Sequence, residues 1–179
     1  GRLGAAANRR RHTQVPGNRG TFVIDRNLNL TNVCEVGCRF CAFHVAPGAA
    51  HAFTLTAEEV AAKARQAAEQ GATQVLVQGG LNPDLDLPFY ERMLRAVKAQ
   101  ADVCLHSLSP AEVHYLAQRS GLTVRAALER LRAAGLDSLP GGGAEILVDD
   151  VRRRVSPRKI SADDWFRVME DAHSLGMKT

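Results

Sequence analysis

The sequence predicts an α/β fold in which helices cover a parallel β-sheet. Short apolar runs that contain β-branched residues, such as residues 73–78 and 102–108, alternate with longer segments whose apolar residues recur at helical spacing. Hydrophobic residues make up 45% of the chain and charged residues 23%, a composition typical of globular proteins. A chain of 179 residues is long enough for one domain with its own core.

Four strand–helix units are expected along the chain. The strands are predicted at residues 21–29, 73–78, 102–108 and 136–139. Such an order favours a parallel sheet, and periodicity alone is compatible with either a doubly wound sheet or a (β/α) barrel. In both folds the loops that follow the C-terminal ends of the strands form the functional site.

The helices between these strands are marked by their start signals and by apolar spacing. A Ser or Thr N-cap begins several of them, in two cases with proline or glutamate in the first turn. We expect helices after Thr56 (with Glu59 as a capping box), over 89–97, after Ser109-Pro110, over 124–131 and after Ser161.

The N-terminal segment, residues 1–20, is basic, and residues 21–179 are expected to form the folded part. The net charge is only +4 and aromatic residues are 5%, so a solvated helix face is favoured over a nucleic-acid-binding arm. No apolar run approaches the ~20 residues of a membrane helix, and no signal peptide is visible. We therefore expect a cytoplasmic protein without nucleic-acid or membrane partners. The chain begins with Gly and ends just after a helix, which predicts the N-terminal portion of a longer protein.

Three of the four cysteines lie close together in a C-x3-C-x2-C pattern formed by Cys34, Cys38 and Cys41. Three thiolates on one loop can hold three irons of a cubane iron–sulfur cluster and leave the fourth iron open to a chelating amino acid. Gly37 gives the loop freedom to fold over such a cluster. Phe40 stands between the last two cysteines, where its ring can lie beside an adenine.

Zinc is the alternative interpretation of the same loop. A structural zinc site takes four protein ligands, and His44 could supply the fourth in C-x3-C-x2-C-x2-H. That reading would make the chain a zinc-binding interaction module rather than an enzyme. Cys104 stands alone in an apolar stretch and is expected to be a buried structural thiol.

The cysteine motif, with an aromatic residue before its last cysteine and a position after the first strand, resembles the radical S-adenosylmethionine (SAM) superfamily. The resemblance implies a partial (β/α)6 barrel, truncated here to about its first four β/α units. It implies that Cys34, Cys38 and Cys41 hold a [4Fe–4S] cluster. It further implies that an electron donor such as flavodoxin or ferredoxin reduces the cluster, which cleaves SAM to methionine and a 5′-deoxyadenosyl radical.

Further motifs resemble the radical SAM enzymes that make menaquinone precursors and the deazaflavin of coenzyme F420. They are QGGLNPDL at 78–85, HSLSP at 106–110 and the glycine-rich run at 135–147. The resemblance implies that Phe40, Gly79, Gly80, Ser109 and Glu145 contact SAM, and that His106 and Glu145 are candidate catalytic residues. From the residues alone, Gly79-Gly80 could be a tight turn, His106 a hydrogen-bonded core histidine, and Glu145 a solvated side chain.

The segment VRRRVSPRKIS at 151–161, together with Asp25-Arg26-Asn27, resembles the cyclic dehypoxanthinyl futalosine synthase family of menaquinone biosynthesis. The resemblance implies hydrogen abstraction from C4′ of a nucleoside-derived small-molecule substrate, dehypoxanthine futalosine, followed by ring closure. The alternatives are aminofutalosine synthase and the F420 side-ring (FO) synthase, in which Cys-Pro is expected where this chain has Ser156-Pro157. The base that accepts the proton is not identified by any motif.

Overall fold

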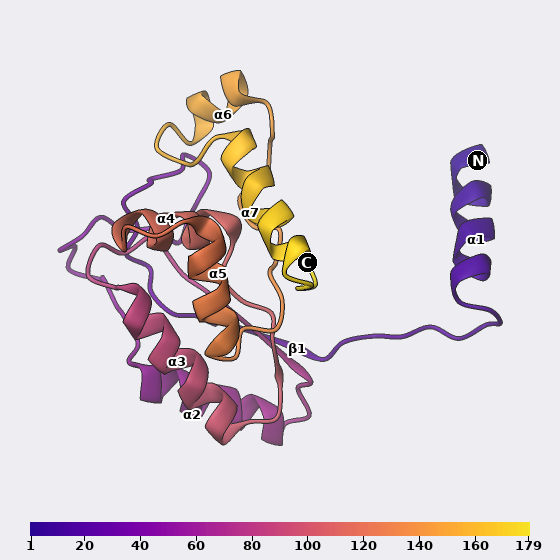
Figure 1. Ribbon diagram of the computed structural model, residues 1–179, viewed down its shortest axis with the longest axis horizontal. Coiled ribbons are helices and arrows are strands. Elements are labelled where there is room, and N and C mark those ends of the chain that lie inside the picture. Colours follow the sequence, from indigo (N-terminus) through magenta and orange to yellow (C-terminus); the bar gives the residue numbers. More distant parts are fainter.

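A computed structural model describes residues 1–179 and contains a parallel three-stranded sheet with helices packed beside it (Figure 1). Strands and helices alternate through most of the chain, as the sequence predicts. The elements in chain order are α1 (Arg2–Gln14), β1 (Asp25–Asn29), α2 (Ala57–Glu69), β2 (Gln74–Gln78), α3 (Leu87–Gln100), β3 (Cys104–Leu105), α4 (Pro110–Arg119), α5 (Val124–Ala133), α6 (Asp149–Val155) and α7 (Ala162–Ser174).

The strands lie across the sheet in chain order, β1-β2-β3, and both neighbouring pairs are parallel. Beyond β3 the same order continues through isolated parallel bridges from His106 to Ser138 and from Ser138 to Lys178. A doubly wound sheet reverses its strand order at a switch point. This sheet does not reverse, so its arrangement is the arc of a (β/α) barrel rather than a doubly wound fold.

The predicted helix starts are confirmed by their capping contacts. Thr56 Oγ1 accepts from the Glu59 amide (3.1 Å), and Glu59 Oε2 accepts from the Thr56 amide (2.7 Å). Ser109 and Glu112 form a second capping box at the start of α4. Ser161 caps α7 with a single bond, in which its hydroxyl oxygen accepts from the Asp164 amide (3.0 Å), without a capping box. Each such cap satisfies amide groups that a helix terminus leaves free.

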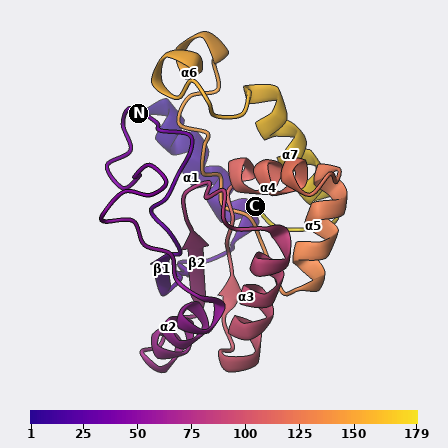
Figure 2. The same cartoon turned by 90° about the vertical axis from the view of Figure 1, so that its left-hand side faces the viewer.

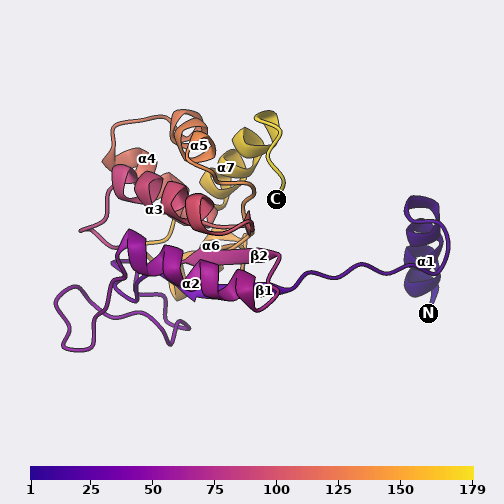
Figure 3. The ribbon, with the colours of Figure 1, turned by 90° about the horizontal axis from the view of Figure 1, so that it is seen from below.

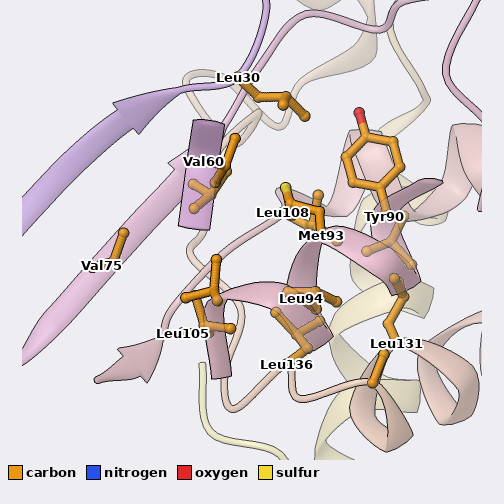
Figure 4. Close-up of a cluster of buried hydrophobic side chains, with 14 of the residues drawn as sticks. Leu30, Val60, Val75, Tyr90, Met93, Leu94, Leu105, Leu108, Leu131 and Leu136 are labelled. Carbon is orange, nitrogen blue, oxygen red and sulfur yellow. The ribbon is translucent and has the colours of Figure 1, made fainter. Parts of the chain in front are cut away.

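One face of the sheet is buried against the helices (Figures 2 and 4). Val75 of β2 and Leu105 of β3 belong to one hydrophobic cluster with Val60 of α2, Leu94 of α3 and Leu131 of α5, and all five are fully buried. A fully buried aliphatic side chain stabilises the fold by about 1.5–3 kcal/mol. This cluster therefore fixes the position of the strand ends, from which the site loops leave.

Several predicted elements are shorter than expected. The segment 21–24 is exposed and β1 begins only at Asp25, while β3 covers two residues of the predicted 102–108. The fourth strand, 136–139, is present only as bridges at Ser138. Helix α6 was not predicted, because its DDVRRRV sequence has no apolar periodicity. Cys104 is half-buried rather than buried.

Helix α1 is separated from the rest of the fold by an extended linker (Figures 1 and 3). None of its residues is buried, which agrees with a solvated helix in the basic N-terminal segment. Neither α1 nor any other helix combines the length and the apolar character needed to span a lipid bilayer.

Deletion of residues 1–20 is expected to change the free energy of unfolding by no more than about 0.5 kcal/mol, because α1 buries nothing. The variant Thr56→Ala serves as the positive control. It removes a capping hydrogen bond from a helix that packs on the core, and should cost about 1 kcal/mol. Urea unfolding followed by circular dichroism measures both. A clearly larger loss on deletion would contradict the division at residue 20.

Candidate functional site

A cavity of about 280 Å³ lies at the C-terminal ends of the strands. Its size is just below the range for small-molecule pockets, roughly 300–1,000 Å³. Loops that follow β1, β2 and β3 meet the glycine-rich run there, and Figure 3 shows the loop after β1 at the end of the sheet opposite the α1 linker. The cavity is lined by all the residues that the sequence assigned to the cluster or to SAM: Cys34, Cys38, Phe40, Cys41, Gly79, Gly80, Ser109 and Glu145.

The cysteine loop is held in shape by its own backbone. The Cys34 amide donates to the Val45 carbonyl (3.0 Å), and the Cys41 amide donates to the Cys38 carbonyl (3.1 Å). Gly37 has a φ of 61°, a left-handed conformation that glycine adopts without steric cost. These contacts bring three cysteines from one short segment to the wall of one cavity.

The thiol donors of this loop fit an iron–sulfur cluster. All three cysteines are free, Cys38 being buried and the other two half-buried. The three thiols line one cavity, but no group of three or more His, Cys, Asp or Glu side chains, these cysteines included, lies close enough together to hold a metal ion as it stands. His44, the fourth ligand in the zinc alternative, bonds through Nδ1 to the Cys41 carbonyl (2.9 Å), which leaves its Nε2 available to a metal ion. Three thiols beside an open cavity match a cluster with one iron free for a ligand.

The loop after β2 lies directly against the segment that carries the cysteines. A Cβ atom at Gly80 would lie 2.0 Å from the Val33 carbonyl oxygen, so no other residue fits without displacing that backbone. The Gly80 amide donates to Thr31 O (3.0 Å), and the Gly79 amide donates to Glu112 Oε1 (3.0 Å). Because both amides are used within the chain, the backbone groups that Gly79 and Gly80 can offer a ligand are their carbonyl oxygens.

Glu112 is a site residue that the sequence analysis did not single out. Besides Gly79, its carboxylate accepts from the Ser109 amide (2.7 Å) and hydroxyl (2.6 Å). Burial raises the pKa of Glu112, and the hydrogen bonds from Ser109 and Gly79 oppose that rise without cancelling it. Leu108, just before Ser109, has a φ of 62°, which is uncommon for a residue other than glycine. The capping-box spacing Ser109-Pro110-Ala111-Glu112 was the signal in the sequence.

Glu145 is held by a lysine rather than left free in solvent. Lys159 Nζ lies 3.0 and 3.1 Å from the two Glu145 carboxylate oxygens and 5.4 Å from the centre of the Phe40 ring. Burial raises the pKa of Glu145, but the hydrogen bond from Lys159 and the charges of Lys159 and Arg152 outweigh it, so the net pKa is lowered. The pair therefore stays ionised at neutral pH and joins the glycine-rich run to the cysteine loop. Lys159 was also missed as a site residue.

Arg152 fixes the shape of the glycine-rich run from behind. It is only 2% exposed and donates to the carbonyl oxygens of Gly143 (2.6 Å), Ile146 (2.8 Å) and Ile160 (2.8 Å). Its Nη2 has no partner. A buried guanidinium that binds three carbonyls holds the segments on both sides of α6 in one conformation.

His106 lies apart from the cavity. It is half-buried on the sheet, and its Nδ1 is 2.7 Å from Ser138 Oγ. The structure therefore does not group His106 with Glu145, the other candidate catalytic residue. It is a half-buried histidine that is hydrogen-bonded to Ser138, and its role stays a prediction.

Residues 28–179 match the sequence profile of the Radical SAM superfamily. This chain belongs to that family. Membership in the radical SAM superfamily implies a [4Fe–4S] cluster and SAM as cofactors, which agrees with the thiol donors at the cavity and disfavours the zinc interpretation.

Relatives with two different named activities resemble this radical SAM chain to the same degree. It is 44% identical to a cyclic dehypoxanthine futalosine synthase from Halalkalibacterium halodurans over 98% of the chain and 48% of the relative. It is also 44% identical to a 5-amino-6-(D-ribitylamino)uracil–L-tyrosine 4-hydroxyphenyl transferase from Methanopyrus kandleri, over 93% of the chain and 45% of the relative. The chain thus spans about half the length of the curated relatives it matches.

Solved structures support the barrel fold. The chain superposes on methylornithine synthase with a TM-score of 0.69 and 19% identity, covering 97% of this chain and 47% of that one. It superposes on HydG, a maturase of the [FeFe]-hydrogenase, with a TM-score of 0.64 and 17% identity, covering 86% and 33%. The radical SAM barrel predicted from the sequence is confirmed, in a truncated form.

The variant Gly80→Ala is expected to bind less than about half the iron of the wild type, because its Cβ would displace the Val33 carbonyl beside Cys34. Gly141→Ala is the matched control, since its Cβ would meet only Trp165 at 3.8 Å, an ordinary contact. Iron content and visible absorbance after anaerobic reconstitution measure both. Equal iron in the two variants would show that the close approach does not shape the cluster loop.

Proposed function

We propose that the protein is a radical SAM enzyme that cyclises dehypoxanthine futalosine to cyclic dehypoxanthinyl futalosine in menaquinone biosynthesis. The observation that carries the proposal is the meeting of three free thiols, a glycine pair and an acidic residue at one cavity of a radical SAM barrel. The futalosine synthase relative over 98% of the chain supports the choice of reaction.

The residues at the cavity have distinct roles in this proposal. Cys34, Cys38 and Cys41 hold the [4Fe–4S] cluster through their thiolates. With SAM bound, that cluster supplies a 5′-deoxyadenosyl radical. The carbonyl oxygens of Gly79 and Gly80 accept from the SAM ammonium group, since the amides of both residues are already engaged.

The remaining cavity residues orient SAM. Phe40 lies beside the adenine, and Ser109 fixes the adjoining wall through Glu112. Glu145 accepts from the ribose hydroxyls, and Lys159 keeps it ionised for that purpose. A one-electron protein donor such as flavodoxin or ferredoxin completes the system, because reductive cleavage of SAM consumes one electron.

The second candidate is the 4-hydroxyphenyl transfer named for the archaeal relatives, which are as similar as the synthase. Ser156 favours the cyclase, since Cys-Pro is expected in the F420 side-ring enzymes at Ser156-Pro157. The Ser156 side chain is buried and its hydroxyl has no partner. Aminofutalosine synthase has only the motif resemblance in its support.

The variant Cys38→Ala is expected to lose the cluster, and with it at least about 90% of the visible iron–sulfur absorbance, because three thiolates are the minimum set for a site-differentiated cubane. Cys104→Ala is the matched control, as that free thiol does not line the cavity. Absorbance and iron content are measured for both variants after anaerobic reconstitution. A colourless wild-type protein with one equivalent of zinc would refute the cluster assignment.

The choice of substrate is tested by incubating the full-length protein anaerobically with SAM, a reductant and either substrate set. We expect consumption of dehypoxanthine futalosine together with formation of 5′-deoxyadenosine, measured by chromatography and mass spectrometry. The parallel incubation contains 5-amino-6-(D-ribitylamino)uracil and L-tyrosine. Conversion of that pair alone would reassign the protein to the transferase.

A further inference from the structure

The two faces of the sheet differ in character. Along β2 the residues alternate, so that Val75 and Val77 are buried whereas Gln74, Leu76 and Gln78 are only partly buried. Gln74, Leu76 and Gln78 lie on the face turned away from the hydrophobic core, which we call the open face of the sheet. Because successive strands are parallel and in register, residues paired across the sheet share a face.

A row of paired positions crosses this open face. Asn27 pairs with Leu76, and Ser138 pairs with His106 through a parallel bridge. The His106 amide donates to Val75 O (3.1 Å), which places His106 beside Leu76. The next row toward the cavity contains Asn29 and Gln78, which both line its wall. The open face is thus polar and continuous with the cavity.

Ser138 is a fixed and buried partner for His106. It is 6% exposed, and two backbone hydrogen bonds join it to β3 and the residues that follow. The Ser138 amide donates to Leu105 O (3.2 Å), and the Ser138 carbonyl accepts from the Ser107 amide (3.0 Å). Its hydroxyl lies 2.7 Å from His106 Nδ1. The one other side-chain group near the hydroxyl is Cys104 Sγ at 4.0 Å, a weak and distant acceptor.

The position of the hydroxyl favours one of the two neutral tautomers of the imidazole. Buried polar groups are normally hydrogen-bonded, and within the chain Nδ1 is the one strong acceptor to which this hydroxyl could donate. If Nδ1 accepts, the neutral ring carries its hydrogen on Nε2. That nitrogen makes no hydrogen bond within the chain, so it can donate to a ligand on the open face.

We propose that Ser138 is a positioning residue that holds His106 in the Nε2–H tautomer, so that His106 donates a hydrogen bond to an oxygen of the substrate on the open face. The acceptor is a carbonyl, carboxylate or sugar hydroxyl oxygen. His106 is then a binding group and not the base of the reaction. The identity of the ligand in this inference rests on the proposed function. The tautomer of His106 does not depend on that function.

The tautomer is tested by long-range ¹H–¹⁵N correlation spectra of the ¹⁵N-histidine-labelled chain before cluster reconstitution, when it is diamagnetic. His106→Gln identifies the signals among those of the six histidines. We expect the Nε2–H pattern for His106 in the wild type and in Ser138→Thr, and a mixture of tautomers in Ser138→Ala. An Nδ1–H pattern in the wild type would overturn the proposal, even if Ser138→Ala does not fold.

Contact with the substrate is tested by kinetics of His106→Gln and His106→Asn in the full-length protein. The Gln amide nitrogen falls near the position of Nε2, whereas that of Asn falls near Nδ1. We expect KM to stay within about threefold for Gln and to rise about tenfold for Asn, with kcat largely kept, as for loss of one hydrogen bond. A fall in kcat of about 10²-fold or more in both variants would indicate a base and overturn the proposal.

Failure of the proposed function has a separate readout. A wild-type protein that forms no 5′-deoxyadenosine from SAM would refute the radical SAM assignment, while the tautomer result would stand on its own. If SAM is cleaved and dehypoxanthine futalosine is consumed, but both His106 variants keep the wild-type KM, then only the substrate contact is refuted.

Discussion

The approach of Gly80 to the Val33 backbone is the constraint on which the rest of the site depends. Two loops that follow neighbouring strands can share a cavity only if their backbones lie close together. A Cβ 2.0 Å from a carbonyl oxygen leaves no room for a side chain at Gly80. The Gly80 amide then bonds to Thr31, and the Gly79 amide bonds to Glu112 of the next unit. Three successive β/α units are thereby joined at their C-terminal ends.

Buried charges extend this linkage to the fourth unit. Glu112 accepts hydrogen bonds from Gly79 and Ser109, and Arg152 donates to three carbonyls around α6. Neither has an opposite charge as a hydrogen-bonded partner, so each depends on its dipolar contacts to offset the cost of burial. Such groups hold their neighbours in one geometry because any other would leave a buried charge without partners. The cavity walls are in this sense preorganised.

Much of the fold could be predicted from local signals. Thr56, Ser109 and Ser161 cap the helices that were expected, because capping depends on residues three positions apart. The strand ends were less predictable, since the length of β3 and of the segment 136–139 depends on partners across the sheet. Helix α6 has no apolar periodicity, and its buried residue is Arg152, which binds carbonyls.

The candidate site, like the fold, has a part that could be predicted from the sequence and a part that could not. The cysteines, Gly79-Gly80 and Glu145 lie in contiguous motifs and could be found in the sequence. The partnership of Lys159 with Glu145 joins positions 14 residues apart on either side of α6, and that of Ser138 with His106 joins positions 32 residues apart. Pairings of that kind follow from the register of the sheet and the path of the loops, which a motif does not encode.

The relatives constrain where substrate choice resides. A futalosine synthase and a 4-hydroxyphenyl transferase are each 44% identical to this chain, although their named reactions differ. In the proposed assignment, the residues of this chain that hold the cluster and SAM need not differ between the two reactions. Discrimination must then come from positions that face the substrate, in this chain or in the remaining length of the relatives. The open face of the sheet adjoins the cavity wall at Asn29 and Gln78 and presents the His106 imidazole. A single donor there favours substrates with an oxygen in reach, because an analogue without one would leave that donor unpaired.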